Sequence, residues 1–216
     1  MQKIVLLQYQ PWRENDFWLD SFSAQGRQSL LLNRPAAPPD LFHLYQGDWP
    51  VGVLPAIKGW QTLQHWPLTN TALYCGLYLN ELLGLLLPEN EPQPQLFQQY
   101  CQTLDALADN SLPDPWLRLF EWHLLQALGY GFSWHKDAQE RDIHPSSSYQ
   151  FKPRLGFVLA AAAAPLACSG KDLLAIHQGS RTLQHWRIMR VVLRMALEDI
   201  LPRPLLSRAL LSGQLS

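Results

Sequence analysis

The sequence of 216 residues contains only three cysteines, Cys75, Cys101 and Cys168, and no Cys-x-x-Cys pair. An odd number of widely spaced thiols does not build a disulfide framework, and it offers no thiolate pair for a structural zinc site. We therefore expect packed, reduced cysteines in a cytoplasmic protein without a signal peptide.

Long apolar stretches are also missing. The longest one runs from Leu155 to Ala167 and is interrupted by Pro165. It is shorter than the roughly 20 residues that span a bilayer. The sequence thus predicts no membrane segment and no membrane partner.

Patterns for covalent chemistry are lacking as well. The seven histidines form no HxxxH or HExxH spacing, which would mark a zinc site on a helix. Cys168 can meet His177 or His185 only through folding, and Ser169-Gly170 beside it fits a helix N-cap better than an active-site loop. Gly129-Tyr130-Gly131 follows a predicted helix, so it is expected to cap that helix and not to bind phosphate. We expect no catalytic residues, no metal and no cofactor.

Charge is unevenly distributed along the chain. Residues 1–70 hold five basic and five acidic side chains, whereas residues 71–114 hold six acidic and no basic ones. Residues 115–216 hold twelve basic side chains against seven acidic ones. The net charge of −1 thus conceals a basic last third, which a polyanion would meet first.

Short apolar runs predict β-strands in the first 65 residues. The expected strands are Lys3–Gln10, Phe17–Ser23, Arg27–Asn33, Leu41–Tyr45, Val51–Ile57 and a last run near Trp60–Leu63. Gly26 lies in the tight connection before the third run, where a hairpin needs a positive φ. Several short strands punctuated by Gly and Pro predict a small barrel.

From Thr71 the apolar residues recur with the helical period of 3.6. The expected helices span 70–87, 94–109, 115–128, 171–178, 181–200 and 205–212. Asp114 before Pro115 predicts an N-cap, and Ser180 is the N-cap expected for the long basic helix. The predicted fold class is α+β, with a β-barrel at 1–66, a boundary near Gln64–Thr69 and an α-helical domain at 67–216.

Two helical segments carry a family resemblance. They are Thr71-Ala-Leu-Tyr-Cys-Gly-Leu-Tyr-Leu-Asn-Glu-Leu-Leu83 and Pro115-Trp-Leu-Arg-Leu-Phe-Glu-Trp-His-Leu-Leu-Gln-Ala-Leu-Gly-Tyr-Gly131. Weaker matches are Trp12–Asp20, Cys168–Ile176, Met195-Ala-Leu and Arg203–Leu210. In this order and spacing they resemble RecO, a family of bacterial recombination mediators. The resemblance implies an N-terminal oligonucleotide-binding barrel, the OB-fold, followed by an α-helical domain.

The resemblance also implies partners and a function without covalent catalysis. Members of the family anneal single-stranded DNA, bind the acidic C-terminal tail of single-strand-binding protein, and act with RecR to load RecA. Two departures stand out in this chain. The segment Asn33–Asp40 keeps only Arg34 where many members have a loop rich in lysine and arginine, and residues 135–149 lack the four cysteines of a zinc site that some relatives carry. Zinc is therefore not expected.

Candidate DNA contacts are cations for phosphates and aromatic faces for bases. Arg187, Arg190 and Arg194 fall at i, i+3 and i+7, so they share one helix face. The full set is Trp12, Arg13, Trp18, Arg27, Arg34, Arg181, Arg187, Arg190, Arg194, Arg203 and Arg208. The ordinary alternatives stay open, because a basic row is often only the solvated side of a helix and a tryptophan in a small domain usually packs inward.

Arg118 and Phe120 are the candidates for binding the tail of single-strand-binding protein. By the resemblance, Arg118 in the segment 117–121 matches a basic residue that holds this tail, and a guanidinium suits a terminal carboxylate. Leu119 replaces a second basic residue of some relatives. The alternative is a solvated arginine that pairs with Glu121 or Glu81.

The leading hypothesis is a bacterial, nucleoid-associated DNA repair and recombination mediator. It would bind and anneal single-stranded DNA, dock on single-strand-binding protein and work with a RecR-like partner. The alternative is a protein adaptor of the same fold with weak or no direct DNA binding, which the cation-poor segment Asn33–Asp40 favours.

Overall fold

The computed structural model describes residues 1–50, 52 and 54–208. The chain divides into two compact units. The first comprises Met1–Phe120 and the segment from Pro202 on, and the second comprises Glu121–Leu201. Each unit is described by itself below.

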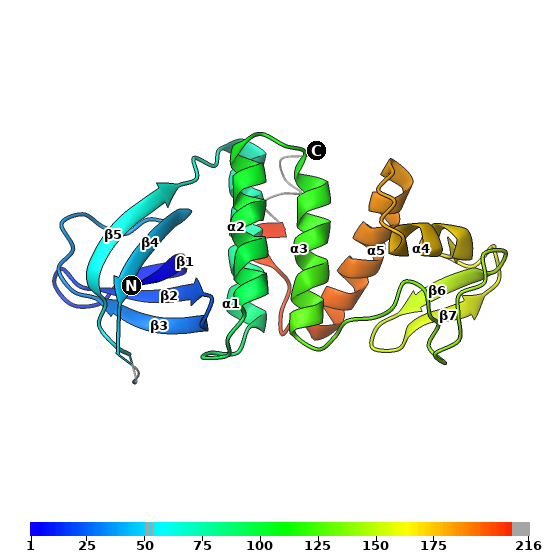
Figure 1. Ribbon diagram of the computed structural model, residues 1–216, viewed down its shortest axis with the longest axis horizontal. Coiled ribbons are helices and arrows are strands. Elements are labelled where there is room, and N and C mark those ends of the chain that lie inside the picture. Colours follow the sequence, from blue (N-terminus) through cyan, green and yellow to red (C-terminus); the bar gives the residue numbers. More distant parts are fainter. Residues whose placement is uncertain (51, 53, 209–216) are drawn as a thin grey trace. The chain divides into compact units, whose positions relative to one another are not determined.

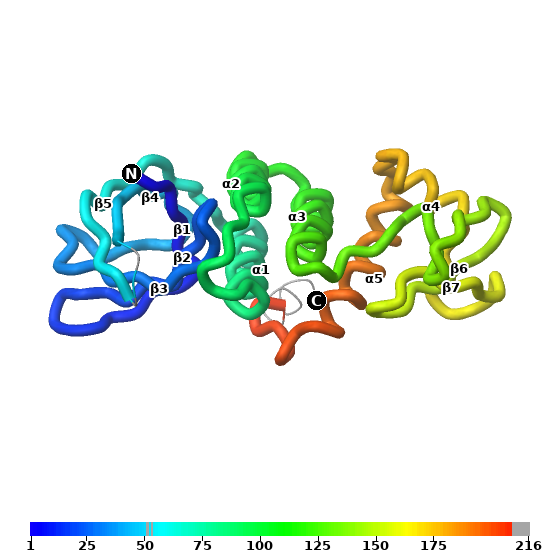
Figure 2. The backbone as a smooth tube through the Cα atoms, turned by 60° about the horizontal axis from the view of Figure 1, so that its bottom comes forward, coloured from blue at the N-terminus to red at the C-terminus, as the bar shows by residue number. Residues whose placement is uncertain are grey.

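Five antiparallel strands form the sheet of the first unit: β1 (Gln2–Pro11), β2 (Phe17–Ser23), β3 (Gly26–Leu32), β4 (His43–Asp48) and β5 (Lys58–His65). Their order in the sheet is β3-β2-β1-β4-β5. The N–H of Leu31 donates to the carbonyl of Pro55, and the N–H of Ile57 donates to the carbonyl of Leu31. The segment before β5 thereby pairs with β3, which curls the sheet into the barrel visible in Figure 2. This closed five-stranded arrangement is typical of an OB-fold.

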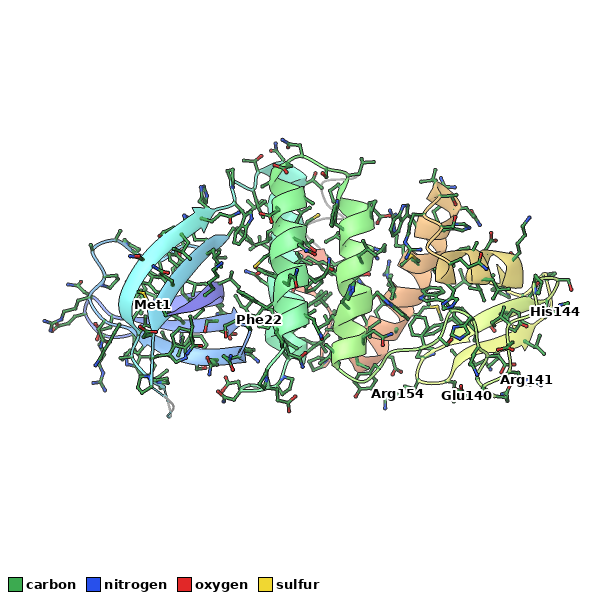
Figure 3. All side chains as sticks on the ribbon, viewed as in Figure 1. Met1, Phe22, Glu140, Arg141, His144 and Arg154 are labelled. Atoms are coloured by element: carbon green, nitrogen blue, oxygen red, sulfur yellow. The ribbon has the colours of Figure 1, made fainter. Side chains whose placement is uncertain are left out.

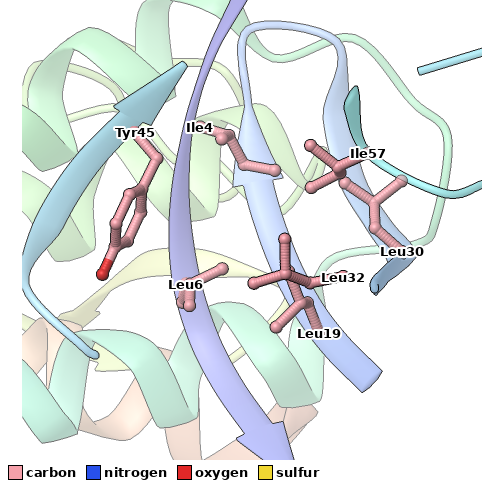
Figure 4. Packing of buried hydrophobic residues seen from close by; sticks show 7 residues of the cluster. All are labelled: Ile4, Leu6, Leu19, Leu30, Leu32, Tyr45 and Ile57. Atoms are coloured by element: carbon pink, nitrogen blue, oxygen red, sulfur yellow. The ribbon is translucent and has the colours of Figure 1, made fainter. Parts of the chain in front are cut away.

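The barrel interior is apolar (Figure 4). Its buried cluster consists of Ile4, Leu6, Leu19, Leu30, Leu32, Tyr45 and Ile57. Ile4 and Leu6 share this face because alternate residues of a strand point to the same side. Val5 and Leu7 are buried on the opposite face, where α1 packs against β1. Burial of both faces explains why β1 reads as a continuous apolar run in the sequence.

Helices cover one side of this barrel (Figure 1). They are α1 (Asn70–Leu86) and α2 (Pro94–Ala108). The helix α3 (Pro113–Ala127) follows them in the chain. The ring of Phe22 on β2 meets the rings of Phe97 and Tyr100 on α2 edge to face, with centroids 5.5 and 6.1 Å apart. Such contacts between large aromatic side chains dominate the energetics of a core, and here they join the barrel to the helices.

The second unit contains a small sheet and two further helices. Its strands are β6 (Ser148–Lys152), β7 (Gly156–Ala160) and β8 (Cys168–Ser169), in the order β7-β6-β8, and its helices are α4 (Gly170–His177) and α5 (Leu183–Ile200). An aromatic cluster joins the segment after α3 to β6. Phe132 lies 4.5 Å from Phe151 and 5.2 Å from Trp134 between ring centroids. The apolar faces of α4 and α5 supply further buried residues to this unit.

The predicted fold class is confirmed, since an N-terminal five-stranded sheet is followed by helices. The predicted strand at Val51–Ile57 is wrong for its described residues, which contribute only an isolated bridge between Ala56 and Leu31. Pro50 and Pro55 each lack the N–H that a strand ladder needs. The three strands β6 to β8 were not predicted.

Helix ends were predicted less well than helices. The helix α3 begins at Pro113, so Asp114 lies in its first turn and is not the N-cap. Thr182 caps α5 instead of Ser180, because the Thr182 side chain accepts a hydrogen bond from the N–H of His185. The predicted positive φ is confirmed at Gly26, with a value of 99°. Of the helix expected at 205–212, residues 206–208 are helical and 209–212 lie outside the described residues.

Candidate nucleic-acid interface

The helix α5 builds a basic face from a simple amphipathic pattern. Its buried side is formed by Ile188, Met189, Val192, Leu193, Ala196 and Leu197. Arg187, Arg190 and Arg194 are all exposed on the remaining side. The structure therefore brings these three predicted contacts together on one solvent-facing row.

Acidic residues lower the positive potential of this row toward the C-terminal end of α5. Arg194 Nε donates to Glu198 Oε1 across 2.8 Å, and Asp199 next to it pairs with Arg154. Exposed ion pairs of this kind are worth only about 0–1 kcal/mol, so an incoming phosphate can compete for the guanidinium. Arg187 makes no ion pair within the described part of the chain. The positive potential is accordingly expected to be strongest in the first half of α5.

Arg181 precedes α5, and its guanidinium already makes contacts within the protein. Its Nη1 donates to the carbonyls of Ile176 and Ser180, each at 2.9 Å, so it caps the C-terminal end of α4. Its guanidinium also lies over the Trp186 ring, 5.6 Å from the centroid. Burial lowers the pKa of Arg181, yet an arginine stays charged at any physiological pH. Its charge can support the row, although the two hydrogen bonds from Nη1 hold it against the end of α4.

Arg203 and Arg208 belong to the first unit and are not part of the α5 row. Arg203 Nη1 lies 3.0 Å from Glu81 Oε1. The guanidinium of Arg208 lies 5.9 Å from the centroid of the Tyr78 ring. Both cations thus interact with α1.

Arg27 on β3 forms a bidentate ion pair with Asp20 on β2. Its Nε donates to Asp20 Oδ1 at 2.8 Å and its Nη2 donates to Asp20 Oδ2 at 2.9 Å, while Nη1 reaches the carbonyl of Leu87. Burial is the main cause that raises the pKa of Asp20. The hydrogen bonds that Arg27 donates to Asp20 raise the pKa of Arg27. This arginine links β2 and β3 to the end of α1.

The other DNA-contact candidates of the barrel lie in or near the β1–β2 turn and the loop after β3. Asp16 lies in the turn between β1 and β2, and its Oδ1 accepts a hydrogen bond from the N–H of Arg34 in the loop after β3. The Asp16 N–H donates to the carbonyl of Arg13. Arg13 and Arg34 are exposed, and Trp12 is 47% exposed. Trp18 is half-buried, so Trp12 is the ring more open to a base.

Arg118 and Phe120 lie on α3 but differ in what they can reach. Arg118 is only 7% exposed, and its Nε is 3.6 Å from Asp114 Oδ1 one turn earlier. Phe120 is fully buried, with its ring 6.2 Å from that of Tyr100. Phe120 therefore supports the helix from inside. Leu119, between Arg118 and Phe120, is half-exposed.

Sequence reasoning missed a cavity of about 750 Å³ in the second unit. Aromatic side chains such as Trp122, Tyr130 and Phe132 line it together with Lys136 and Arg154. Figure 3 shows Arg154, Glu140 and Arg141 along the lower edge of this unit. The lining comes from α3, the loop after it, β6, β7 and α5, so no single stretch of sequence carried its signal.

Among the residues that the structure describes, no helix combines the length and the apolar character that a membrane span needs. The same residues contain no cluster of three or more His, Cys, Asp or Glu side chains arranged to hold a metal ion.

Comparison with known proteins gives consistent matches along the chain. The family described as "Recombination protein O C terminal" matches residues 69–209. A protein of Pseudomonas paraeruginosa is 35% identical over 185 aligned residues, which cover 81% of this chain and 78% of that protein. A protein of Pseudomonas putida is 34% identical over an alignment of 227 positions, which covers 97% of this chain and 96% of that protein. A protein of Stutzerimonas stutzeri is 32% identical over an alignment of the same length, which covers 97% of this chain and 92% of that protein. All three are named "DNA repair protein RecO".

Proposed function

Because the chain belongs to the RecO family of DNA repair proteins, we propose that it binds and anneals single-stranded DNA. With a RecR-like partner it would help to load RecA at the nucleoid. The observation that carries this proposal is the exposed row of Arg187, Arg190 and Arg194 on α5. The exposed side chains of Trp12, Arg13 and Arg34 on the barrel supply a second set of contacts.

Annealing needs positioning and charge screening and no covalent step. Two complementary strands repel each other through their phosphates, and cations that bind one strand release its counterions and lower the repulsion toward the other. The second unit is suited to this role, because its 81 residues carry nine basic and seven acidic side chains. The first 120 residues carry six basic side chains against eleven acidic ones. The row on α5 would therefore supply most of the positive charge that screens the phosphates.

We further propose that the tail of single-strand-binding protein docks on α3 around Arg118, with Phe120 as the buried support. Arg118 lies 3.6 Å from Asp114, which is longer than a good charge-assisted hydrogen bond of about 2.7–2.9 Å. A terminal carboxylate can form two parallel hydrogen bonds with the guanidinium and so replace Asp114. Leu119 next to it is half-exposed and can receive an apolar side chain of the tail.

An annealing assay tests the proposed function. Two complementary labelled oligonucleotides are mixed with and without the protein at low salt, and duplex formation is followed by energy transfer. The protein should raise the annealing rate above the spontaneous one, and added salt should remove the increase. An annealing rate equal to the spontaneous one at low salt would refute the proposal.

A protein adaptor with little direct DNA binding is the second candidate function. It is favoured by the number of arginines that already have an acidic partner: Arg27, Arg141, Arg154, Arg194 and Arg203. Such an adaptor would bind the tail peptide fully and leave the annealing rate unchanged. The same assay, run beside a peptide titration, separates the two candidates.

A further inference from the structure

Four aromatic rings form a stacked column on the barrel. They come from His65 and Trp60 on β5 and from His43 and Tyr45 on β4. The ring centroids of His65 and His43 are 4.3 Å apart, and those of Tyr45 and Trp60 are 4.0 Å apart, with interplanar angles of 19° and 22°. His43 and Tyr45 join the two halves at 5.5 Å and 19°. The rings therefore run nearly parallel from the exposed His65 to the half-buried Trp60.

The column borders a groove of about 680 Å³. Leu32, Tyr45, Ile57 and Trp60 supply apolar and aromatic surface to it. Residues 35–38 of the loop after β3 line it, as do residues 59–62 of β5. The groove thus lies near the place where the segment before β5 is bridged to β3, between Ala56 and Leu31.

Hydrogen bonds fix the loop at both of its ends, so the groove is preformed. The N–H of Arg34 donates to Asp16 Oδ1 at 3.0 Å. At the other end, the Tyr45 hydroxyl donates to the carbonyl of Asp40 at 3.1 Å and accepts from its N–H at 2.9 Å. Figure 4 shows the Tyr45 side chain among the core residues of the barrel, so a ring of the column itself holds the loop in place.

We propose that this groove accepts one nucleobase of single-stranded DNA, stacked on Trp60. This inference rests on the proposed function, because it names the barrel contact through which the strand would be held. A base has a flat apolar face for the ring and a polar edge for hydrogen bonds. The groove offers the matching groups, with Trp60 as the ring and Asn33, Gln61 and Thr62 as polar neighbours.

The charge of the groove supports a base over a phosphate. Asp40 is the single acidic or basic residue, histidine aside, among its described lining, and its Oδ1 already accepts a hydrogen bond from the N–H of Leu41. A phosphate inside would meet this carboxylate without a matching cation. Arg34 and Lys58, which flank the lining residues in the sequence and are exposed, are instead placed for phosphates outside the groove. The short, cation-poor loop after β3 is consistent with such a role.

Stacking and phosphate contact have different signatures, which makes the proposal testable. Stacking of one base contributes about 1–3 kcal/mol, a factor of about 5 to 150 in affinity, and involves no counterion release. We would titrate labelled single strands, one intact and one with abasic sites throughout, against the wild-type protein and Trp60→Leu. The salt dependence is measured for each pair, and Tyr130→Ala removes an exposed ring outside the groove as a matched control.

The expected result is that Trp60→Leu lowers affinity for the intact strand by about 5- to 150-fold and leaves the salt slope unchanged. The abasic strand should bind the wild type and the variant equally weakly, while Tyr130→Ala should match the wild type. Equal wild-type affinity for intact and abasic strands would overturn the proposal, even if Trp60→Leu failed to fold. Loss of affinity in Trp60→Leu that is the same for both strands would overturn it too. If the wild type bound neither strand at low salt, the proposed function itself would fall.

Discussion

The Tyr100 hydroxyl donates a hydrogen bond of 2.6 Å to Asn80 Oδ1 in the core of the first unit. Asn80 Nδ2 in turn donates to the carbonyls of Leu6 and Leu7, each at 3.2 Å. The pairing of β1 with β2 shifts register between Leu6 and Gln8, and such an irregularity interrupts the hydrogen bonds of the ladder. A side chain of α1, held by one of α2, therefore satisfies the backbone of the central strand.

Removal of the Tyr100 hydroxyl should destabilise the protein. Tyr100→Phe leaves Asn80 Oδ1 without its donor in a fully buried site, which costs about 1–3 kcal/mol. Urea denaturation should show a lower midpoint with an unchanged slope. Tyr130→Phe, at an exposed tyrosine, is the control and should leave the midpoint unchanged. Equal midpoints for all three proteins would refute the structural role of this hydroxyl.

Stability should fall in acid because of Glu81. Burial acts to raise the pKa of this carboxyl, but hydrogen bonds from Ser207, Leu206 and Arg203 outweigh it and leave the pKa below the ordinary 4.5. A carboxyl with a lowered pKa in the folded state contributes stability above its unfolded pKa. This contribution is lost as the pH falls through the folded pKa.

Hydrogen exchange of the amides of Leu206 and Ser207 measures this effect. Both N–H groups donate to Glu81, so their protection should be high at neutral pH and fall below pH 4.5. Glu81→Gln should reduce the protection already at neutral pH and remove most of its pH dependence. Protection in the wild type that stays constant down to low pH would contradict the assignment.

All three thiols should be poor nucleophiles in the folded protein. Burial raises the pKa of Cys75 and Cys168 to about 11 and that of Cys101 to about 12. Because the thiolate is the reactive form, alkylation by iodoacetamide near neutral pH should be slow until urea unfolds the chain. Mass spectrometry of the alkylated peptides gives the rate for each residue. A native cysteine that reacts as fast as a free thiol would contradict this account.

Arg118 should control binding of the acidic tail. Arg118→Gln keeps a polar but shorter side chain and removes the charge. Affinity for a fluorescent tail peptide should therefore fall by about tenfold to a hundredfold, as expected for loss of one charge-assisted pair of about 1.5–3 kcal/mol. Arg141→Gln removes a cation in the second unit that pairs with Asp137 and serves as the matched control. Peptide affinity that is equal in Arg118→Gln and the wild type would show that the tail binds elsewhere.

The sequence was most informative where one periodic pattern decided the structure. The short apolar run at Phe17–Ser23, followed by the turn at Gly26, and the 3.6-residue period of 181–200 predicted β2 and α5 to within a few residues. The strand β6 alternates polar and apolar residues, Ser-Tyr-Gln-Phe-Lys, but it is five residues long and its partners β7 and β8 are separate short runs. Because short strands become stable only when paired, their presence depends on contacts that the local pattern does not contain.

The candidate site was predictable in the same limited sense. The spacing of Arg187, Arg190 and Arg194 was enough to place them on one face. Acidic partners of other arginines were harder to foresee, since Arg203 and Glu81 are 122 residues apart. The Arg27 pair with Asp20 was within reach of the sequence, because the hairpin around Gly26 brings β2 and β3 together. Partners that come from distant elements require the fold.

The most direct test of the central claim is the salt dependence of single-strand affinity, measured by fluorescence polarisation between about 50 and about 200 mM salt. Three phosphate contacts by the α5 row predict a log-log slope of about −2, and the double variant Arg187→Gln, Arg190→Gln should make it shallower by about 1.4. The variant Arg141→Gln removes a cation that pairs with Asp137 and should leave the slope unchanged. Undetectable binding at low salt, or a slope that only Arg141→Gln alters, would contradict the account.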